Sequence, residues 1–496
     1  MVPSLNIRCR RWGRFRVTAL SVFLAAAVPG GCANYEGISP RLNIEGAPAL
    51  EASATIGQAQ AVPSPWPQDD WWRSYGDPQL DALIAEALQE SPTLQTARAR
   101  IDQANAAAQL ADANRQPQAT AGLDSTRQRF SEHYLVPPPL AGTYQNTNRL
   151  ALDFSYEFDF WGKHRAALDA ALSRARAAEV DAQGARLLIT SAIARSYAEL
   201  DRQFRQREVA EAARQQREQI STLTRSRVRA GLDSQVELRQ AEAAVPAARG
   251  DIAAIEERIA SIRHQLAALT GAGPDRGLTI GRPNLNAADT LGLPTALPAD
   301  LIGRRPDVVA QRWRVEAAAK EISSAKSAFY PNIDLVGFIG FSAIGLDKLF
   351  DSGSRIVGAG PALRLPIFDG GRLRANLAGR DAEFDAAVAQ YRATLVDALR
   401  DVADQLAAWR AVEAQLAEQR RAQAQVEEAY RLALLRYREG LANYLNVLAT
   451  QTQVLAQRRL QADLLARRID IAIGLTRALG GGFGPDGGAQ RTAAGT

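Results

Sequence analysis

The sequence is poor in the residues that build disulfides and metal centres. Its 496 residues include only two cysteines, Cys9 and Cys32, and three widely separated histidines with no ligand-like spacing. The glycine run that starts at Gly480 is not followed by the Lys-Ser/Thr of a phosphate-binding loop. We therefore expect no disulfide, metal site or cofactor, and a protein that is not an enzyme.

The sequence also lacks an excess of charge and a long apolar run. Residues 1–31 contain five arginines and no acidic residue; without them, 54 basic residues balance 54 acidic ones. This balance gives no support for a nucleic-acid partner. The apolar stretch Val17–Val28 is about a dozen residues long, which is too short for a helix that spans a bilayer.

The first 31 residues have the pattern of a secretory signal, because an arginine-rich start is followed by the apolar stretch and then by small residues. The Gly30-Gly31-Cys32 sequence resembles a bacterial lipobox, in which the cysteine is acylated and becomes the new N-terminus. The resemblance implies lipidation of Cys32. Pro29 stands where the lipobox pattern has leucine, and ordinary signal cleavage nearby is the alternative.

Residues 149–160 alternate between large apolar side chains and polar ones, with Ala151 at one of the polar positions, which predicts a strand with one apolar face and one polar face. The apolar set is Leu150, Leu152, Phe154, Tyr156, Phe158 and Phe160. After Trp161-Gly162, no proline interrupts about 67 residues rich in Ala, Arg, Gln and Glu. As a single helix this segment would be about 100 Å long, which is not an element of an ordinary compact domain.

The pattern then repeats at a nearly constant offset. Arg305-Pro306 follows Ser91-Pro92 by 214 positions, and each pair predicts the start of a helix. Arg438-Glu-Gly440 follows Arg229-Ala-Gly231 by 209 positions, and each glycine suits the end of a long helix. The constant shift predicts a tandem duplication of a helix, two strands, a long helix and a second helix. The second strand pair is expected at Ile333–Phe341 and Ile356–Phe368.

We divide the chain as follows: signal peptide 1–31, N-terminal arm 32–77, first repeat 78–272, linker 273–298, second repeat 299–479 and disordered tail 480–496. The arm contains an aromatic cluster, made of Trp66, Trp71, Trp72 and Tyr75. We interpret this cluster as an anchor that holds the arm to the main body. A ligand cage is the alternative.

The helices carry a narrow apolar seam instead of a broad apolar face. In the helix that starts near Ser234, the seam has coiled-coil spacing and comprises Ile252, Ile255, Ile259, Ile262, Leu266 and Leu269. Polar residues on the remaining faces indicate water on both sides, as in a hollow helical cylinder. Four strands with an apolar outer face are too few to close a membrane barrel, so several copies must contribute strands. The sequence therefore predicts an oligomer.

Three motifs resemble the outer-membrane efflux protein family, most closely its lipoprotein branch that serves resistance-nodulation-division (RND) pumps. They are Leu301-Ile-Gly-Arg-Arg-Pro-Asp-Val308, Ala328-Phe-Tyr-Pro-Asn332 and Tyr437-Arg-Glu-Gly-Leu-Ala-Asn-Tyr-Leu-Asn446. The resemblance implies a mainly α fold with a small transmembrane β part: a homotrimer with an α-helical barrel in the periplasm and a shared twelve-strand β-barrel in the outer-membrane lipid. The implied function is a passive exit duct for small molecules or drugs. Its implied partners are a periplasmic adaptor (membrane fusion) protein and an inner-membrane RND transporter.

The resemblance also implies roles for the helix–helix turns. The adaptor would dock at the tips, namely Arg229, Gly231, Leu232, Asp233, Ser234, Arg438, Gly440, Leu441, Ala442 and Asn443. Asn443, Leu445 and Ala449 would line the aperture of the resting channel. Relatives place an Asp and an Arg at the positions of Ala449 and Thr452, so we expect an apolar constriction around Leu445 in place of a charged gate.

Two other functions compete with drug efflux. A duct for type I protein secretion has the same architecture, but the lipobox and the Arg-Arg-Pro-Asp-Val sequence favour efflux. A periplasmic coiled-coil protein without a pore would explain the helices. It would not explain why strands are fused to both repeats.

Overall fold

The computed structural model describes residues 34–44, 65–133, 135–286 and 303–484, together with the backbone of two short strands, β1 (Val62–Pro63) and β4 (Gly292–Leu293). The signal peptide, Cys32 and residues 485–496 lie outside the described residues. The chain divides into two compact units. One comprises Met1–Gly46, Ala104–Arg174 and Arg314–Ala389, and the other comprises Ala47–Gln103, Ala175–Trp313 and Gln390–Thr496.

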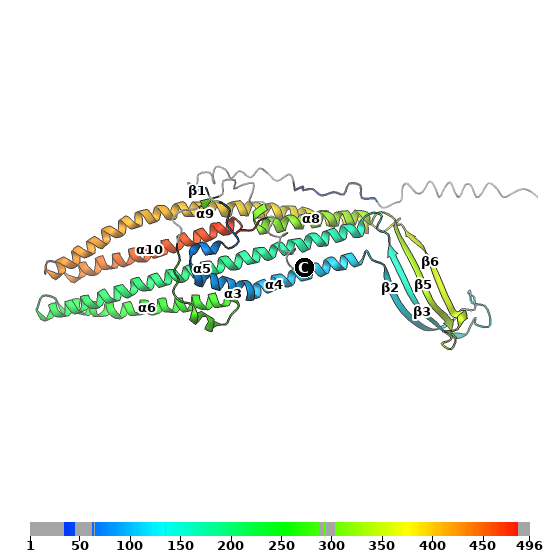
Figure 1. Ribbon diagram of the computed structural model, residues 1–496, viewed down its shortest axis with the longest axis horizontal. Helices are drawn as coiled ribbons and strands as arrows, with labels where there is room; N and C mark the ends of the chain where they lie inside the picture. Colours follow the sequence, from blue (N-terminus) through cyan, green and yellow to red (C-terminus); the bar gives the residue numbers. More distant parts are fainter. Residues whose placement is uncertain are drawn as a thin grey trace, which may run out of the picture. The chain divides into compact units, whose positions relative to one another are not determined.

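The first unit contains a four-stranded antiparallel sheet in the order β2-β3-β5-β6, drawn in Figure 1. The strands are β2 (Gln118–Arg129), β3 (Tyr144–Glu157), β5 (Asn332–Ile344) and β6 (Arg355–Arg364). The two repeats meet where β3 pairs with β5, from Thr147 opposite Ile344 to Glu157 opposite Asp334. Two strands in each repeat were predicted, and the structure confirms them.

The predicted strands 149–160 and 356–368 run too far at their C-terminal ends. β3 stops at Glu157, since the carboxylate of Asp159 accepts hydrogen bonds from the backbone nitrogens of His164 (3.2 Å) and Arg165 (2.8 Å). Asp369 likewise accepts from the nitrogen of Leu373 at 2.8 Å, and β6 ends before it. An aspartate that caps the following helix leaves the chain no room to continue as a strand.

The alternation along β3 produces the predicted apolar face. Leu150 lies opposite Phe341 and Leu152 opposite Ile339, and Phe154 on the same face is 44% exposed. On the opposite face, Arg149 bonds Asp153 at 2.5 and 3.0 Å. That face is less polar than predicted, because Phe338 lies opposite Asp153 and its ring is 5.8 Å from the Arg149 guanidinium.

The helices follow the duplication. The first repeat has α3 (Pro78–Glu90), α4 (Pro92–Ala113), α5 (Lys163–Arg229) and α6 (Gln235–Thr270); the second has α8 (Pro306–Ser327), α9 (Arg372–Arg438) and α10 (Tyr444–Ala478). Both long helices, α5 and α9, have 67 residues. No helix among the described residues combines the length and the apolar character needed to cross a membrane.

In the second unit, the aromatic arm packs into the main apolar core. Trp71, Trp72 and Tyr75 form the short helix η1 (Trp71–Tyr75), and each is less than a tenth exposed. They belong to one cluster with the α6 seam, of which Ile255, Ile259, Ile262 and Leu266 are buried. This packing supports the anchor interpretation over a ligand cage.

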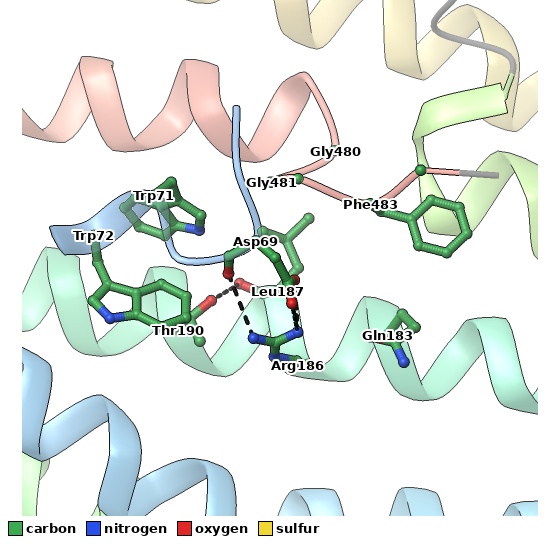
Figure 2. Close-up of a pocket in the computed structure, with 12 residues that line it drawn as sticks. Asp69, Trp71, Trp72, Gln183, Arg186, Leu187, Thr190, Gly480, Gly481 and Phe483 are labelled. Atoms are coloured by element: carbon green, nitrogen blue, oxygen red, sulfur yellow. Dashed lines mark hydrogen bonds and ion pairs between the residues drawn. The ribbon is translucent and has the colours of Figure 1, made fainter. Parts of the chain in front are cut away.

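The glycine-rich segment Gly480–Gly482, which we call the clasp, also contacts the arm (Figure 2). The Arg186 guanidinium on α5 pairs with the Asp69 carboxylate at 2.5 and 2.6 Å beside a small cavity of about 230 Å³. Gly480–Gly482 close this cavity, and a Cβ on Gly482 would overlap the backbone of Gln68 and Asp69. Gly480–Gly484, which we predicted as the start of a disordered tail, are therefore a packed segment.

Candidate functional site

The turn between α5 and α6 ends one hairpin of helices. Gly231 has φ +76°, a conformation that side chains with a Cβ rarely adopt, and its nitrogen donates to the carbonyl of Val228 at 3.0 Å. The nitrogen of Leu232 donates to the carbonyl of Arg227 at 2.9 Å. Ser234 then caps α6 in a reciprocal arrangement with Glu237. The predicted stop at Gly231 and start at Ser234 are confirmed.

The turn between α9 and α10 has the same design. Gly440 has φ +77°, and the nitrogen of Leu441 donates to the carbonyl of Arg436 at 2.8 Å. Asn443 caps α10 by accepting a hydrogen bond from the nitrogen of Asn446 at 3.2 Å. The side chain of Asn443, predicted to line an aperture and to form part of the tip, is thus also used in capping.

A buried polar network joins the two hairpins. The hydroxyl of Tyr437 on α9 donates to the Asp233 carboxylate at 2.6 Å and lies 2.9 Å from the Thr224 hydroxyl. Arg227 pairs with Asp233 at 2.9 Å, donates to the carbonyl of Tyr437 at 3.0 Å and places its guanidinium 4.6 Å from the tyrosine ring. Tyr437 is fully buried, and the side chains of Arg227 and Asp233 are at most a tenth exposed. The network therefore ties the first turn directly to the second.

The network changes the acidity of its members. Burial, together with the hydrogen bond to Asp233, raises the pKa of Tyr437 to about 12. The hydrogen bond to Asp233 raises the pKa of Arg227. Near neutral pH the tyrosine hydroxyl is therefore a proton donor and the arginine is charged, as the geometry requires.

The Arg227–Asp233 ion pair of this network has no counterpart in the second repeat. The positions 209 residues after Arg227 and Asp233 are Arg436 and Ala442, so the second turn has no equivalent ion pair. Asp233 was predicted as a tip residue, whereas Arg227 and Thr224 were not predicted and Tyr437 was named only as part of a motif. The contacts join residues more than 200 positions apart, for which periodicity gives no signal.

The outer surface of both turns is apolar and exposed. Leu232 and Leu441 are 63% and 69% exposed, and Val236 and Leu445 are 63% and 50% exposed. Each pair is related by the 209-residue offset. Of the predicted tip residues, Asp233 has a buried side chain and Ala442 is half-buried, while Arg229, Gly231, Leu232, Ser234, Arg438, Gly440, Leu441 and Asn443 are exposed. We call the side chains of Leu232, Val236 and Leu441 the tip patch.

The predicted aperture residues lie near the start of α10. Leu445, Ala449 and Thr452 are exposed, and their spacing of four and three residues places them on one helix face. The Thr452 hydroxyl donates to the carbonyl of Leu448 at 2.8 Å. This face therefore carries an apolar side chain, a methyl group and an internally bonded hydroxyl, and none of the three is charged.

The Arg-Arg-Pro-Asp motif forms a second polar node, at the start of α8. Arg305 is buried, pairs with Asp307 at 2.7 Å and Asp401 at 3.3 Å, and donates to the carbonyl of Ala478 at 3.2 Å. The guanidinium of the preceding arginine stacks on the Trp66 ring at 4.9 Å. The motif thus joins the start of α8, the end of α10 and the middle of α9.

The Phe-Tyr-Pro-Asn motif forms the junction between α8 and β5. Tyr330 stacks on Trp161 with the ring centroids 4.6 Å apart. The indole nitrogen of Trp161 donates to the carbonyl of Pro331 at 2.9 Å, and Ser327 donates to the carbonyl of Trp161 at 2.7 Å. These contacts join the helix-to-strand junction of the second repeat to the strand-to-helix junction of the first.

The model of the outer membrane efflux protein family matches residues 83–272 and 297–481, which cover nearly all of the first repeat and all of the second. The chain belongs to the outer membrane efflux protein family. It is 41% identical over 369 residues to the fusaric acid resistance protein FusA of Burkholderia cepacia, covering 73% of this chain and 69% of FusA. It is 34% identical over 428 residues to the multidrug resistance outer membrane protein MdtP of Shigella flexneri, covering 85% and 88%.

A solved structure supports the same family and fold. The outer membrane protein VceC of Vibrio cholerae superposes with a TM-score of 0.78 at 40% identity, covering 84% of this chain and all of VceC. This member of the outer membrane efflux protein family is thus an outer-membrane efflux channel with a mainly helical fold and a small β part. Its family consists of channel and transport proteins, not enzymes.

Proposed function

We propose that three copies of the chain form a passive exit duct for small molecules, supplied by a periplasmic adaptor and an inner-membrane RND transporter. The observation that carries the proposal is the four-stranded sheet. Its edge strands, β2 and β6, have no further partner among the described strands, and one of its faces is apolar and exposed. Pairing β6 of one copy with β2 of the next would satisfy both edges, and three copies would give a closed barrel of twelve strands.

Small toxic compounds are the proposed cargo. The relatives that support this class are named for resistance to fusaric acid and to multiple drugs. Because a passive duct offers no selective site of its own, the inner-membrane transporter would choose the compounds. Protein secretion is the alternative cargo, and it has no support from these names.

The tip patch is the proposed adaptor dock. Leu232 and Val236 on the first hairpin and Leu441 on the second present apolar surfaces to water, which is typical of a surface that a partner covers. Arg229 and Arg438 flank these surfaces, and the open space around Gly231 and Gly440 allows a partner's backbone to approach closely.

The network at Tyr437 is the proposed lock of the resting duct. It holds the α9–α10 turn against the α5–α6 turn, so movement of either hairpin must break it. In this proposal Leu445 and Ala449 form an uncharged constriction, and Asn443 borders it. Adaptor docking on the tip patch would supply the energy that separates the hairpins.

Acylation of Cys32 is the proposed membrane anchor, with the signal peptide removed before it. The supporting observation is the Gly-Gly-Cys sequence after a secretory signal. Radiolabelled palmitate should enter the wild-type protein and not a Cys32→Ser variant. Equal labelling of the two proteins would refute acylation at this residue.

The efflux proposal is tested in a host that lacks this gene and contains the adaptor and the pump. Wild-type protein should restore dye export, whereas Leu232→Asp with Leu441→Asp should not, since charges on the tip patch oppose docking. Leu278→Asp is the matched control, because Leu278 is 73% exposed on η2 (Pro274–Thr279), away from both turns. Full export by the double variant would exclude the tip patch as the dock. Failure of the wild type to restore export of any tested compound would count against drug efflux.

A further inference from the structure

The N-terminal segment Asn34–Leu42, which we call the strap, is bonded to α9 at two points. Arg374 donates to the backbone carbonyl of Asn34 at 2.7 Å and to that of Glu36 at 3.2 Å. Eleven residues further along α9, Asp385 accepts hydrogen bonds from the backbone nitrogens of Arg41 (3.0 Å) and Leu42 (2.8 Å). All of these residues lie in the first unit.

The two attachment points fix the path of the strap. Arg374 and Asp385 are separated by about 16 Å along the helix at 1.5 Å per residue. Between them the chain makes a turn, in which the nitrogen of Ile38 donates to the carbonyl of Tyr35 at 3.1 Å and Gly37 has φ +81°. Beyond this turn the strap continues to Arg41 beside α9, and Ile38 packs on the cluster that contains Leu377.

Aromatic contacts hold the first part of the strap. The ring of Tyr35 meets Phe329 edge-on, with centroids 5.4 Å apart, and its hydroxyl lies 3.2 Å from the Tyr330 hydroxyl. The ammonium group of Lys326 lies 5.8 Å from the Tyr35 ring. These contacts place Tyr35 of the strap at the Phe-Tyr-Pro-Asn junction.

Asp381 lies on the same stripe of α9, between the two attachment points. It is only 5% exposed, and neither carboxylate oxygen has a hydrogen-bond partner among the described residues. The charged groups that act on it are Lys326 from α8 and Asp385 from α9 itself. Burial raises the pKa of Asp381, Lys326 lowers it, and Asp385 raises it further, with a net rise.

We propose that Asp381 is a proton-binding site beneath the strap, and that its protonation strengthens docking of the strap on α9. A bare carboxylate without hydrogen bonds is costly to bury, whereas a neutral carboxyl group is not. In this proposal the strap is part of what keeps Asp381 from water, so lifting the strap exposes the carboxylate and returns its pKa toward the ordinary value. The docked form therefore binds a proton more tightly than the undocked form, and by linkage docking weakens as pH rises from the undocked pKa toward the docked pKa.

The test is hydrogen exchange of the Arg41 and Leu42 amides in the detergent-solubilised protein from about pH 3.5, just below the ordinary pKa of an aspartate, to about pH 8. Protection factors, corrected for the intrinsic exchange rate at each pH, report how firmly the strap is docked. In the wild type we expect protection to fall with pH, by at most about tenfold per pH unit. In Asp381→Asn, which keeps the shape and removes the charge, protection should be higher at pH 8 and should not show this fall.

Glu383→Gln is the matched control, because this neighbouring carboxylate on α9 is 59% exposed and pairs with Arg380. It should retain the wild-type profile. Asp385→Ala should lower protection at every pH, which establishes that the measurement detects an undocked strap. Unchanged protection within α9 would verify that the variants are folded. A flat wild-type profile, or the same fall in Asp381→Asn, would overturn the proposal.

Discussion

Tyr437→Phe removes a single hydroxyl from the network that joins the two hairpins. The lost group donates to the Asp233 carboxylate at 2.6 Å and lies 2.9 Å from the Thr224 hydroxyl. The phenyl ring can keep the position of the tyrosine ring under the Arg227 guanidinium. Asp233 also keeps its pair with Arg227, so the variant should fold and should differ mainly in how firmly the turns hold each other.

The size of the effect follows from the kind of bond that is lost. A buried hydrogen bond to a charged group contributes about 1.5–3 kcal/mol. If separation of the hairpins breaks this bond, its loss raises the ratio of open to closed channels by about 10- to 150-fold per protomer, at about 1.4 kcal/mol per factor of ten. Since the pKa of Tyr437 is about 12, the effect should not vary between pH 5 and 9.

Single-channel recording in planar bilayers measures this ratio as the open fraction. Tyr437→Phe should raise the open fraction strongly, while the conductance of the open level changes little. Tyr444→Phe is the matched control, because Tyr444 is also buried and its hydroxyl is hydrogen-bonded to no described residue. An open fraction of Tyr437→Phe equal to that of the wild type and the control would refute the lock.

Three further predictions concern other parts of the chain. Arg305→Ala should lower the free energy of unfolding by about 2–4 kcal/mol. The loss is somewhat smaller than for a fully buried ion pair because Asp307 is 48% exposed. Chemical denaturation measures the free energy of unfolding, and a loss under about 1 kcal/mol would contradict the prediction. Gly482→Ala should weaken the packing of the clasp on the arm, because Gly482 has φ +89° and a Cβ there would overlap the arm. The arm should therefore be cleaved faster in limited proteolysis. Cleavage at the wild-type rate would count against this role of the clasp. Ala449→Asp combined with Thr452→Arg should place a charged pair at the proposed constriction and lower the open fraction in single-channel recordings. An unchanged open fraction would show that these two residues lie outside the constriction.

The sequence alone predicted the elements whose signal is local or periodic. The alternation around Leu150 predicted the first strand of the β3–β5 pair, and the 209-residue offset placed both helix–helix turns at Gly231 and Gly440. The strand ends were wrong where Asp159 and Asp369 cap the next helix. These capping bonds join residues close in sequence, so they were in principle predictable. They were missed because an aspartate in an alternating stretch is equally compatible with the polar face of a strand.

The polar networks could not be predicted in the same way. The contacts of Tyr437 with Asp233 and of Asp385 with the strap join residues 204 and about 344 positions apart. No period links such residues, and a buried carboxylate such as Asp381 looks like any other acidic residue on a solvated helix. Only the packing of α8, α9 and the strap distinguishes it from Glu383 two residues later.

We propose that copies of this chain assemble into a duct through the outer membrane. The most direct test of this proposal combines native mass with planar-bilayer conductance on one purified preparation. We expect trimers that insert into the bilayer, stay closed most of the time and open to discrete conductance levels. A monodisperse species of another stoichiometry that never conducts would contradict the account and leave a periplasmic coiled coil.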